Sequence, residues 1–181
     1  INREVYTDEV IESLGLKKDE LIEKKAVEVG NIFTLGTKFS EPFDLKYKNE
    51  KGEFEMVFMG CYGIGLGRLM GTIVEVFSDD KGIIWPEAVA PFKYSLIEIP
   101  SEKPEVKEMA EKIYKKLGED NVLYDDRDLR AGEKFADADL LGLPYQIIIS
   151  EKNIASGQLE LKNRKTGEVK MISEDEFQNL C

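Results

Sequence analysis

Histidine is absent from the 181 residues of this sequence, and cysteine occurs only twice, at Cys61 and Cys181. Without histidine the chain cannot supply a Ser-His-Asp triad, a Cys-His catalytic pair or a His-ligated zinc ion. Two distant cysteines provide neither a disulfide framework nor the spacing of a metal site. We therefore predict that the side chains form no metal site.

Long apolar runs are also missing, so the sequence contains no signal-peptide pattern and no transmembrane segment. We expect a cytoplasmic protein without a membrane partner. The net charge of −11 argues against non-specific coating of nucleic acid, although it does not forbid a local basic patch. A hydrophobic content of 42% is enough for a core, in one large domain or two small ones.

A cluster of glycines stands out against this background, at Gly60, Gly63, Gly65 and Gly67. The preceding segment, 53–61, is rich in apolar and aromatic residues and predicts a strand. The following segment predicts a buried helix, because its apolar residues recur at helical spacing. They are Leu66, Leu69, Met70, Ile73, Val74 and Phe77. Arg68 would lie in the first turn of that helix, away from its apolar stripe.

Glycines that lack a Cβ atom allow close approach to the backbone, and an arginine beside them can bind a phosphate or stack on a base. Gly63, Gly65 and Arg68 therefore suggest a nucleotide site. The spacing fits neither a dinucleotide fingerprint nor a Walker loop. On spacing alone, a close-packed joint between strand and helix explains the glycines equally well.

The segment GCYGIGLGR resembles motif 3 of the class II aminoacyl-tRNA synthetases, G-x-G-x-x-R. Three further segments resemble the bacterial-type prolyl-tRNA synthetases: EVGNIFTLGTKFSEPF, GIIWPEAVAPF and VLYDDRDLRAGEKFADADLLGLPYQIII. The resemblance extends from residue 26 to residue 172 in the order that the family uses, which makes it more specific than a single motif.

The resemblance implies an α/β protein with two parts. The first is an α+β fragment of a class II antiparallel sheet, and the second is a three-layer α/β anticodon-binding domain with a mixed sheet. We expect a linker or remnant of an insertion at 1–25, the end of the catalytic domain at 26–81, a linker at 82–91 and the anticodon-binding domain at 92–181. The alternation of strand and helix after Phe92 agrees with the last assignment.

Local patterns predict the individual elements. The expected strands cover 26–35, 53–61, 94–99, 122–124 and 145–150, followed by a hairpin of 158–163 and 169–172. The expected helices cover 104–117 and 133–141. Shorter helices are predicted around Val10–Leu14 and Leu21–Ile22, and Ser173 with Glu176 resembles a capping box for a last helix that contains Phe177 and Leu180.

The resemblance also implies roles for individual residues. Arg68 would lie across the adenine ring and phosphates of ATP, with Glu28 and Asn31 on the ATP side and Mg²⁺ bound with the nucleotide. Many members have histidine where this chain has Asn31. Four residues match the wall of the proline pocket: Phe33, Cys61, Tyr62 and Gly63. From the residues alone, solvation explains Glu28 and core packing explains Cys61.

In the second domain, four residues match positions that face anticodon bases: Arg127, Phe135, Asp139 and Gln146. Arg130 and Lys134 are suited to backbone phosphates. From the residues alone, a solvated, salt-bridged loop is the preferred interpretation of the segment 125–130. A further basic cluster is typical of a solvated hairpin: Lys162, Arg164, Lys165 and Lys170.

Motifs 1 and 2 of the class II synthetases do not occur in the sequence. We therefore expect a C-terminal portion of a homodimeric proline-tRNA ligase that cannot form prolyl-adenylate alone, with proline, ATP and tRNA(Pro) as substrates. A non-catalytic tRNA-binding or regulatory relative is the main alternative. Another synthetase of the same subgroup is a third reading, which Cys61–Tyr62 and the GIIWP segment weaken.

Overall fold

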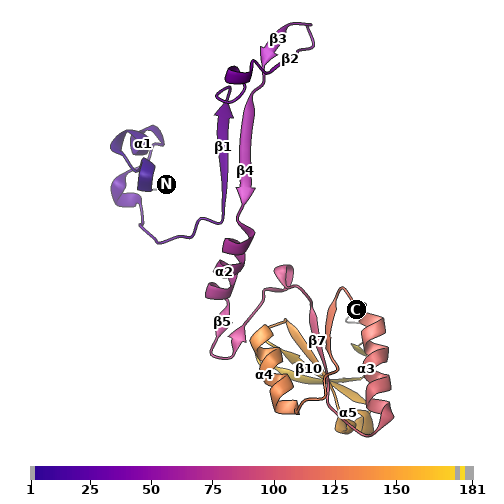
Figure 1. The fold of residues 1–181 in the computed structure, drawn as a ribbon. Coiled ribbons are helices and arrows are strands. Elements are labelled where there is room, and N and C mark those ends of the chain that lie inside the picture. The colour runs from indigo at the N-terminus through magenta and orange to yellow at the C-terminus, as the bar shows by residue number, and fades with distance from the viewer. Residues whose placement is uncertain (1–2, 174–175, 178–181) are drawn as a thin grey trace. The chain divides into compact units, whose positions relative to one another are not determined.

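A computed structural model of the chain describes residues 3–173 and 176–177 (Figure 1). By internal contacts the chain divides into two compact units, residues 1–65 and residues 66–181.

The first unit begins with the short helix α1, Asp8–Ser13. Thr7 caps this helix, since its side-chain oxygen accepts a hydrogen bond from the backbone N–H of Val10. The helix predicted near Leu21 and Ile22 is wrong. A single 3-10 turn lies there instead, at Lys18–Glu20, and Leu21 is already extended.

The centre of this unit is an antiparallel pair of strands, β1 (Gly30–Gly36) and β4 (Met59–Ile64). A small hairpin of β2 (Lys46–Lys48) and β3 (Phe54–Met56) lies between them in the sequence. Its turn is closed by the side chain of Asn49, whose oxygen accepts hydrogen bonds from the backbone N–H groups of Lys51 and Glu53.

The predicted strand boundaries need two corrections. The first strand starts at Gly30, four residues later than expected. The expected strand 53–61 is divided between β3 and β4, because its first half pairs with β2, up to the hydrogen bond from the N–H of Val57 to Leu45, and its second half pairs with β1. β4 then runs on to Ile64, so Gly60 and Gly63 belong to a strand and only the chain near Gly65 forms the turn.

The second unit begins with α2 (Leu66–Val76), which starts where the glycine pattern predicts a helix. The structure describes all of α2, and none of its side chains is buried, in contrast to the buried helix that we expected. A small hairpin follows shortly after α2. Its two strands, β5 (Ser78–Asp79) and β6 (Gly82–Ile83), have two residues each.

The remaining chain forms a five-stranded sheet with the strand order β11-β10-β9-β7-β8. Its strands are β7 (Tyr94–Glu98), β8 (Val122–Asp125), β9 (Tyr145–Ile149), β10 (Gln158–Asn163) and β11 (Val169–Ser173). β8, β7 and β9 are parallel, whereas β10 and β11 are antiparallel to their neighbours. The expected mixed sheet is therefore confirmed.

Helices cover both faces of this sheet (Figure 1). α3 (Pro104–Leu117) and α5 (Glu151–Ser156) pack on the face that carries Leu96 and Ile147, and α4 (Ala131–Leu141) packs on the face that carries Ile97 and Ile148. This arrangement confirms the three-layer α/β architecture.

Local signals explain where most of these elements end. Gly118 follows α3 and Gly142 follows α4, both with positive φ. Ser173 and Glu176 form the predicted capping box through two reciprocal hydrogen bonds. Leu180, which we assigned to the last helix, lies outside the described residues. α5 was not predicted.

Candidate functional site

The residues expected around proline lie on the β1–β4 pair. Phe33 is directly opposite Cys61, and Asn31 is directly opposite Gly63, so these four positions share one face of the pair. Tyr62 lies opposite Ile32 on the other face. The strand register therefore brings together three of the four residues assigned to the proline pocket and separates Tyr62 from them.

The residues expected around ATP come from both units. Glu28 is exposed and precedes β1, so it is not the strand residue that we expected. Nearby, the backbone N–H of Gly65 bonds to the carbonyl of Val29. Arg68 lies in the first turn of α2 and is exposed, as its position off the apolar stripe predicts. Its role at ATP stays a prediction.

In the second unit, Arg127 follows the carboxyl end of β8. Its guanidinium donates hydrogen bonds to the carboxylates of Asp125 and Asp137 at 2.8–2.9 Å, while about half of the side chain stays exposed. Both contacts raise the pKa of Arg127, Asp125 more than Asp137, and the guanidinium lowers the pKa of Asp125. The expected salt-bridged loop is therefore present, with Arg127 at its exposed side.

Arg127 also borders a cavity of about 360 Å³ between the sheet and α4. The floor and walls are largely apolar, with Leu123, Leu140 and Leu141 among the lining residues. Arg127, Asp125 and Asp137 provide polar groups at the same cavity. An apolar cavity with a few polar groups is the usual form of a site for a small planar molecule.

Two other residues expected near RNA lie in the core. Phe135 is half-buried and packs against the cluster of Ile97, Ala138 and Ile148. Lys134 is only 1% exposed, and its ammonium group donates to the backbone carbonyls of Glu98 (2.6 Å) and Asp125 (3.1 Å). The ammonium group of Lys134 therefore stabilises the fold. The prediction that Lys134 binds a backbone phosphate is wrong, because this group is buried.

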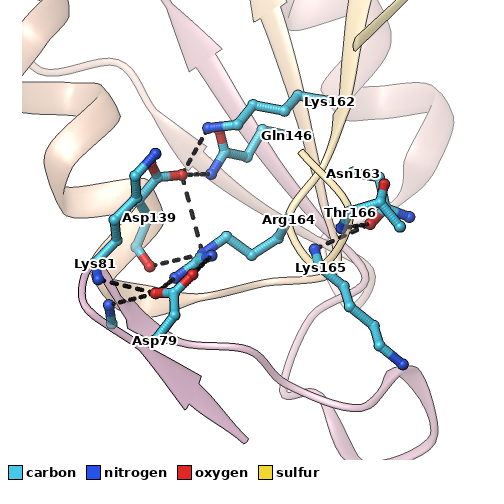
Figure 2. A network of polar contacts seen from close by, with 10 residues as sticks. Asp79, Lys81, Asp139, Gln146, Lys162, Asn163, Arg164, Lys165 and Thr166 are labelled. Atoms are coloured by element: carbon cyan, nitrogen blue, oxygen red, sulfur yellow. Dashed lines mark hydrogen bonds and ion pairs between the residues drawn. The ribbon is translucent and has the colours of Figure 1, made fainter. Parts of the chain in front are cut away.

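Asp139 and Gln146 form part of a buried polar network (Figure 2). Gln146 is fully buried, and its amide donates to Asp139 Oδ1 at 2.7 Å. The same oxygen accepts from Lys162 Nζ at 2.7 Å. Burial alone would raise the pKa of Asp139, but the hydrogen bonds from Lys162 and Gln146 outweigh it and leave the pKa below its ordinary value. In this arrangement neither side chain is offered to a base edge.

Two family models match successive parts of the chain. The family model of the anticodon binding domain matches residues 89–181. The chain belongs to the anticodon-binding domain family. A second model, the tRNA synthetase class II core domain (G, H, P, S and T), matches residues 10–77.

Several curated proteins similar to this chain are named proline–tRNA ligases. The ligase of Wolbachia sp. subsp. Brugia malayi is 46% identical over 162 residues, which cover 90% of the chain and 38% of the relative. The ligase of Rickettsia bellii is 50% identical over 155 residues, 84% of the chain and 36% of the relative. The chain thus spans less than half the length of these curated relatives. The resemblance to prolyl-tRNA synthetases is confirmed.

A solved structure shares the fold. The prolyl-tRNA synthetase of Giardia lamblia, determined in complex with prolyl-adenylate, superimposes with a TM-score of 0.67 at 25% identity. The match covers 80% of this chain and 32% of that protein.

Sequence reasoning missed the residue that joins the anticodon-binding domain to the hairpin after α2. Arg164 was assigned to a solvated basic hairpin, but it is 5% exposed and forms a bidentate ion pair with Asp79 (2.6 and 2.8 Å). The partners are 85 positions apart. Neither the spacing nor the composition of the sequence carries a signal for such a pair.

Within 3–173 and 176–177, no cluster of three or more His, Cys, Asp or Glu side chains is suited to hold a metal ion. In the same part of the chain, no helix is long and apolar enough to cross a membrane.

Proposed function

We propose that this chain is the C-terminal part of a prolyl-tRNA synthetase, which joins proline to ATP as prolyl-adenylate and then transfers the prolyl group to tRNA(Pro). The observation that carries the proposal is the 46–50% identity to proline–tRNA ligases over 84–90% of the chain. The similarity therefore includes the glycine-rich segment and Arg68 as well as the anticodon-binding domain.

In this proposal the β1–β4 pair forms one wall of the proline pocket. Phe33, Cys61 and Gly63 share a face of the pair, and small apolar groups there suit a five-membered ring. Tyr62 lies on the other face of the strand pair, opposite Ile32, and would contribute to the pocket indirectly by packing against that face.

Arg68 is the proposed catalytic residue, because a permanent planar cation suits both the adenine ring and the charge that develops on phosphate oxygens. Glu28 and Asn31 would bind the nucleotide. Mg²⁺ would arrive with ATP and draw most of its ligands from the phosphates and water.

The cavity beside Arg127 is the proposed site of an anticodon base. Leu123, Leu140 and Leu141 offer an apolar lining for the ring, and Arg127 can donate to its edge. Phe135 lies one helical turn before Asp139 and would support the packing of α4 near this cavity. Asp139 and Gln146 would contribute by fixing the position of α4 and β9.

Exposed apolar side chains support the proposal that further chain completes the catalytic domain. Ile32 and Tyr62, which lie opposite each other on β1 and β4, are 83% and 84% exposed. Contiguous exposed apolar groups of this kind usually mark an interface. We propose that upstream residues with motifs 1 and 2 cover them, that the complete enzyme is a cytoplasmic homodimer, and that this chain alone does not form prolyl-adenylate.

The test is proline-dependent exchange of pyrophosphate into ATP, measured on a protein that contains this chain together with the residues encoded before Ile1. We expect exchange with proline and none with threonine or glycine. Arg68→Ala should lower the rate by about 10²–10³, the usual effect of removing one preorganised donor, without a change in the midpoint of thermal unfolding. Binding of tRNA(Pro) without any exchange would favour the non-catalytic relative instead.

A further inference from the structure

Arg164 occupies an unusual position for a charged residue of a hairpin. It directly follows β10, its backbone N–H bonds to the carbonyl of Pro144, and its side chain is 4% exposed. Burying a guanidinium is costly unless its donors are satisfied and its charge is paired. Here Nη1 and Nη2 donate to the two carboxylate oxygens of Asp79, and Nε donates to the backbone carbonyl of Asp139 at 3.0 Å (Figure 2).

The contacts of Arg164 join several elements at one point. Asp79 belongs to β5, and Asp139 belongs to α4. The carboxylate of Asp139 in turn receives Gln146 from β9 and Lys162 from β10, and Lys81 of the β5–β6 turn lies 3.8 Å from its other oxygen. Both oxygens of the Asp79 carboxylate and Oδ1 of Asp139 are paired in this network, whereas the buried Oε1 of Gln146 has no hydrogen-bond partner among the described residues. The charged pairs of the network hold β5, α4 and β10 in one arrangement.

The backbones of the hairpin and α4 approach each other so closely that only glycine fits. A Cβ atom added at Gly82 would lie 2.4 Å from the Cα atom of Leu140, and one added at Gly142 would lie 1.8 Å from the carbonyl oxygen of Ile83. The N–H of Trp85 also bonds to the carbonyl of Gly142. The β6 side of the hairpin therefore contacts the carboxyl end of α4 directly, and Arg164 is the residue that binds its β5 side.

The hairpin is also continuous with α2. The N–H of Phe77 extends the helix by bonding to Ile73, and the N–H of Ile84 bonds to the carbonyl of Phe77 as the chain returns. α2 is one uninterrupted helix, and Arg68 lies in its first turn. Only Phe77 and the first residues of the hairpin separate the end of this helix from the contact of Gly82 with α4.

We propose that Arg164 is a positioning residue for the synthetase reaction, because its grip on Asp79 and Asp139 fixes the helix that carries Arg68 to the anticodon-binding domain. The inference rests on the proposed function. A helix released at its far end would misplace Arg68, and a displacement of about 1 Å at a catalytic group can reduce a rate by about a hundredfold. Arg164 touches no substrate in this proposal.

The test compares variants of the protein that includes the upstream residues. Arg164→Gln removes the positive charge of the pair. Asp79→Asn removes the negative charge of the half-exposed partner and keeps a side-chain oxygen that can accept from the N–H groups of Lys81 and Gly82. Lys170→Gln is the matched control, because it removes a cation from the same β10–β11 hairpin at an exposed position. The measurements are kcat and KM for proline-dependent pyrophosphate exchange, and the Kd of an anticodon stem-loop of tRNA(Pro).

We expect Arg164→Gln and Asp79→Asn each to lower kcat by about tenfold or more, with KM for proline and ATP and the stem-loop Kd within about twofold of wild type. The double variant should lose no more than the stronger single variant, because both changes break one contact. An unchanged kcat, an equal fall in Lys170→Gln, or a parallel loss of stem-loop binding would overturn the inference. If wild type shows no exchange, the proposed function itself fails.

Discussion

Phe33 and Cys61 lie directly opposite each other on β1 and β4, so their side chains project from the same face of the strand pair. The register of β1 and β4 determines which residues lie on each face of the strand pair. One face holds Phe33, Cys61 and Gly63, and the other holds Ile32 and Tyr62. The proposed proline pocket therefore has a definite side, which a pair of substitutions can test.

The first prediction concerns that side. Cys61→Leu adds bulk to the face with Phe33, and overfilling a fitted apolar site typically costs about 1–3 kcal/mol. In the protein with its upstream residues, we expect KM for proline to rise by about tenfold while KM for ATP stays unchanged. Ile32→Leu, on the other face, is the control. An equal rise in both variants would contradict the assignment of the pocket to the Phe33 face.

The second prediction concerns Lys134, whose buried ammonium group joins Glu98 of β7 to Asp125 of β8. Lys134→Ala would leave the backbone carbonyls of Glu98 and Asp125 without this donor, and a buried polar group left unsatisfied costs about 1–3 kcal/mol. We expect the urea midpoint of the 181-residue chain to fall accordingly.

Lys107→Ala is the control for this loss. Lys107 is an exposed lysine of α3, and exposed substitutions usually change stability by less than about 0.5 kcal/mol. Equal midpoints for Lys134→Ala and Lys107→Ala would show that the buried contacts of Lys134 contribute nothing to the fold.

The third prediction concerns acid stability. The guanidinium of Arg164 and the N–H groups of Lys81 and Gly82 hold the pKa of Asp79 well below its ordinary value of 3.8. A lowered pKa in the folded state stabilises the fold fully above the unfolded pKa, and this stabilisation is lost as the pH falls toward the folded pKa. Wild type should therefore lose stability below about pH 4 more steeply than Asp79→Asn.

The measurement is the urea midpoint of both proteins at a series of pH values below about pH 5. Other carboxylates with a lowered pKa, such as Asp125 and Asp139, are present in both proteins, so their contribution cancels in the difference. Parallel curves for the two proteins would contradict the stabilising role of the Asp79–Arg164 pair.

The sequence predicted elements whose signals are local. The helix 104–117 was placed at its observed ends, because Pro104 and Gly118 mark its first turn and its cap and the apolar stripe has a clear period. The parallel strands followed from buried apolar runs separated by helices. α5 was not predicted, because a helix of six residues without an apolar stripe gives no periodic signal in the sequence.

The candidate functional site could be predicted only in part, because only some of its features have a local signal in the sequence. The position of Arg68 in the first turn of α2 followed from the helical period. The burial of Lys134 and Arg164 did not, because a charged side chain enters a core only when partners from distant segments meet it there. Those partners are 36 and 85 positions away, beyond the reach of any local pattern.

The last prediction concerns the anticodon face. Arg127 is the half-exposed cation of the cavity beside α4, whereas Asp139 is buried in the network of Arg164 and Lys162. We expect Arg127→Ala to reduce the preference of the 181-residue chain for a tRNA(Pro) anticodon stem-loop over one with substituted anticodon guanines. A good base contact discriminates by about 1–3 kcal/mol in duplex DNA, used here only as a scale, so the preference should fall by about tenfold.

Two control variants separate this role from the fold and from charge. Asp139→Ala should lower the urea midpoint, since it leaves Lys162 and Gln146 without their acceptor. Lys165→Ala, at the exposed turn of the β10–β11 hairpin, should weaken both stem-loops equally, because a contact to phosphate carries no sequence information. If Arg127→Ala also weakens both stem-loops equally, Arg127 binds phosphate rather than a base, and the base-binding role of the cavity is wrong.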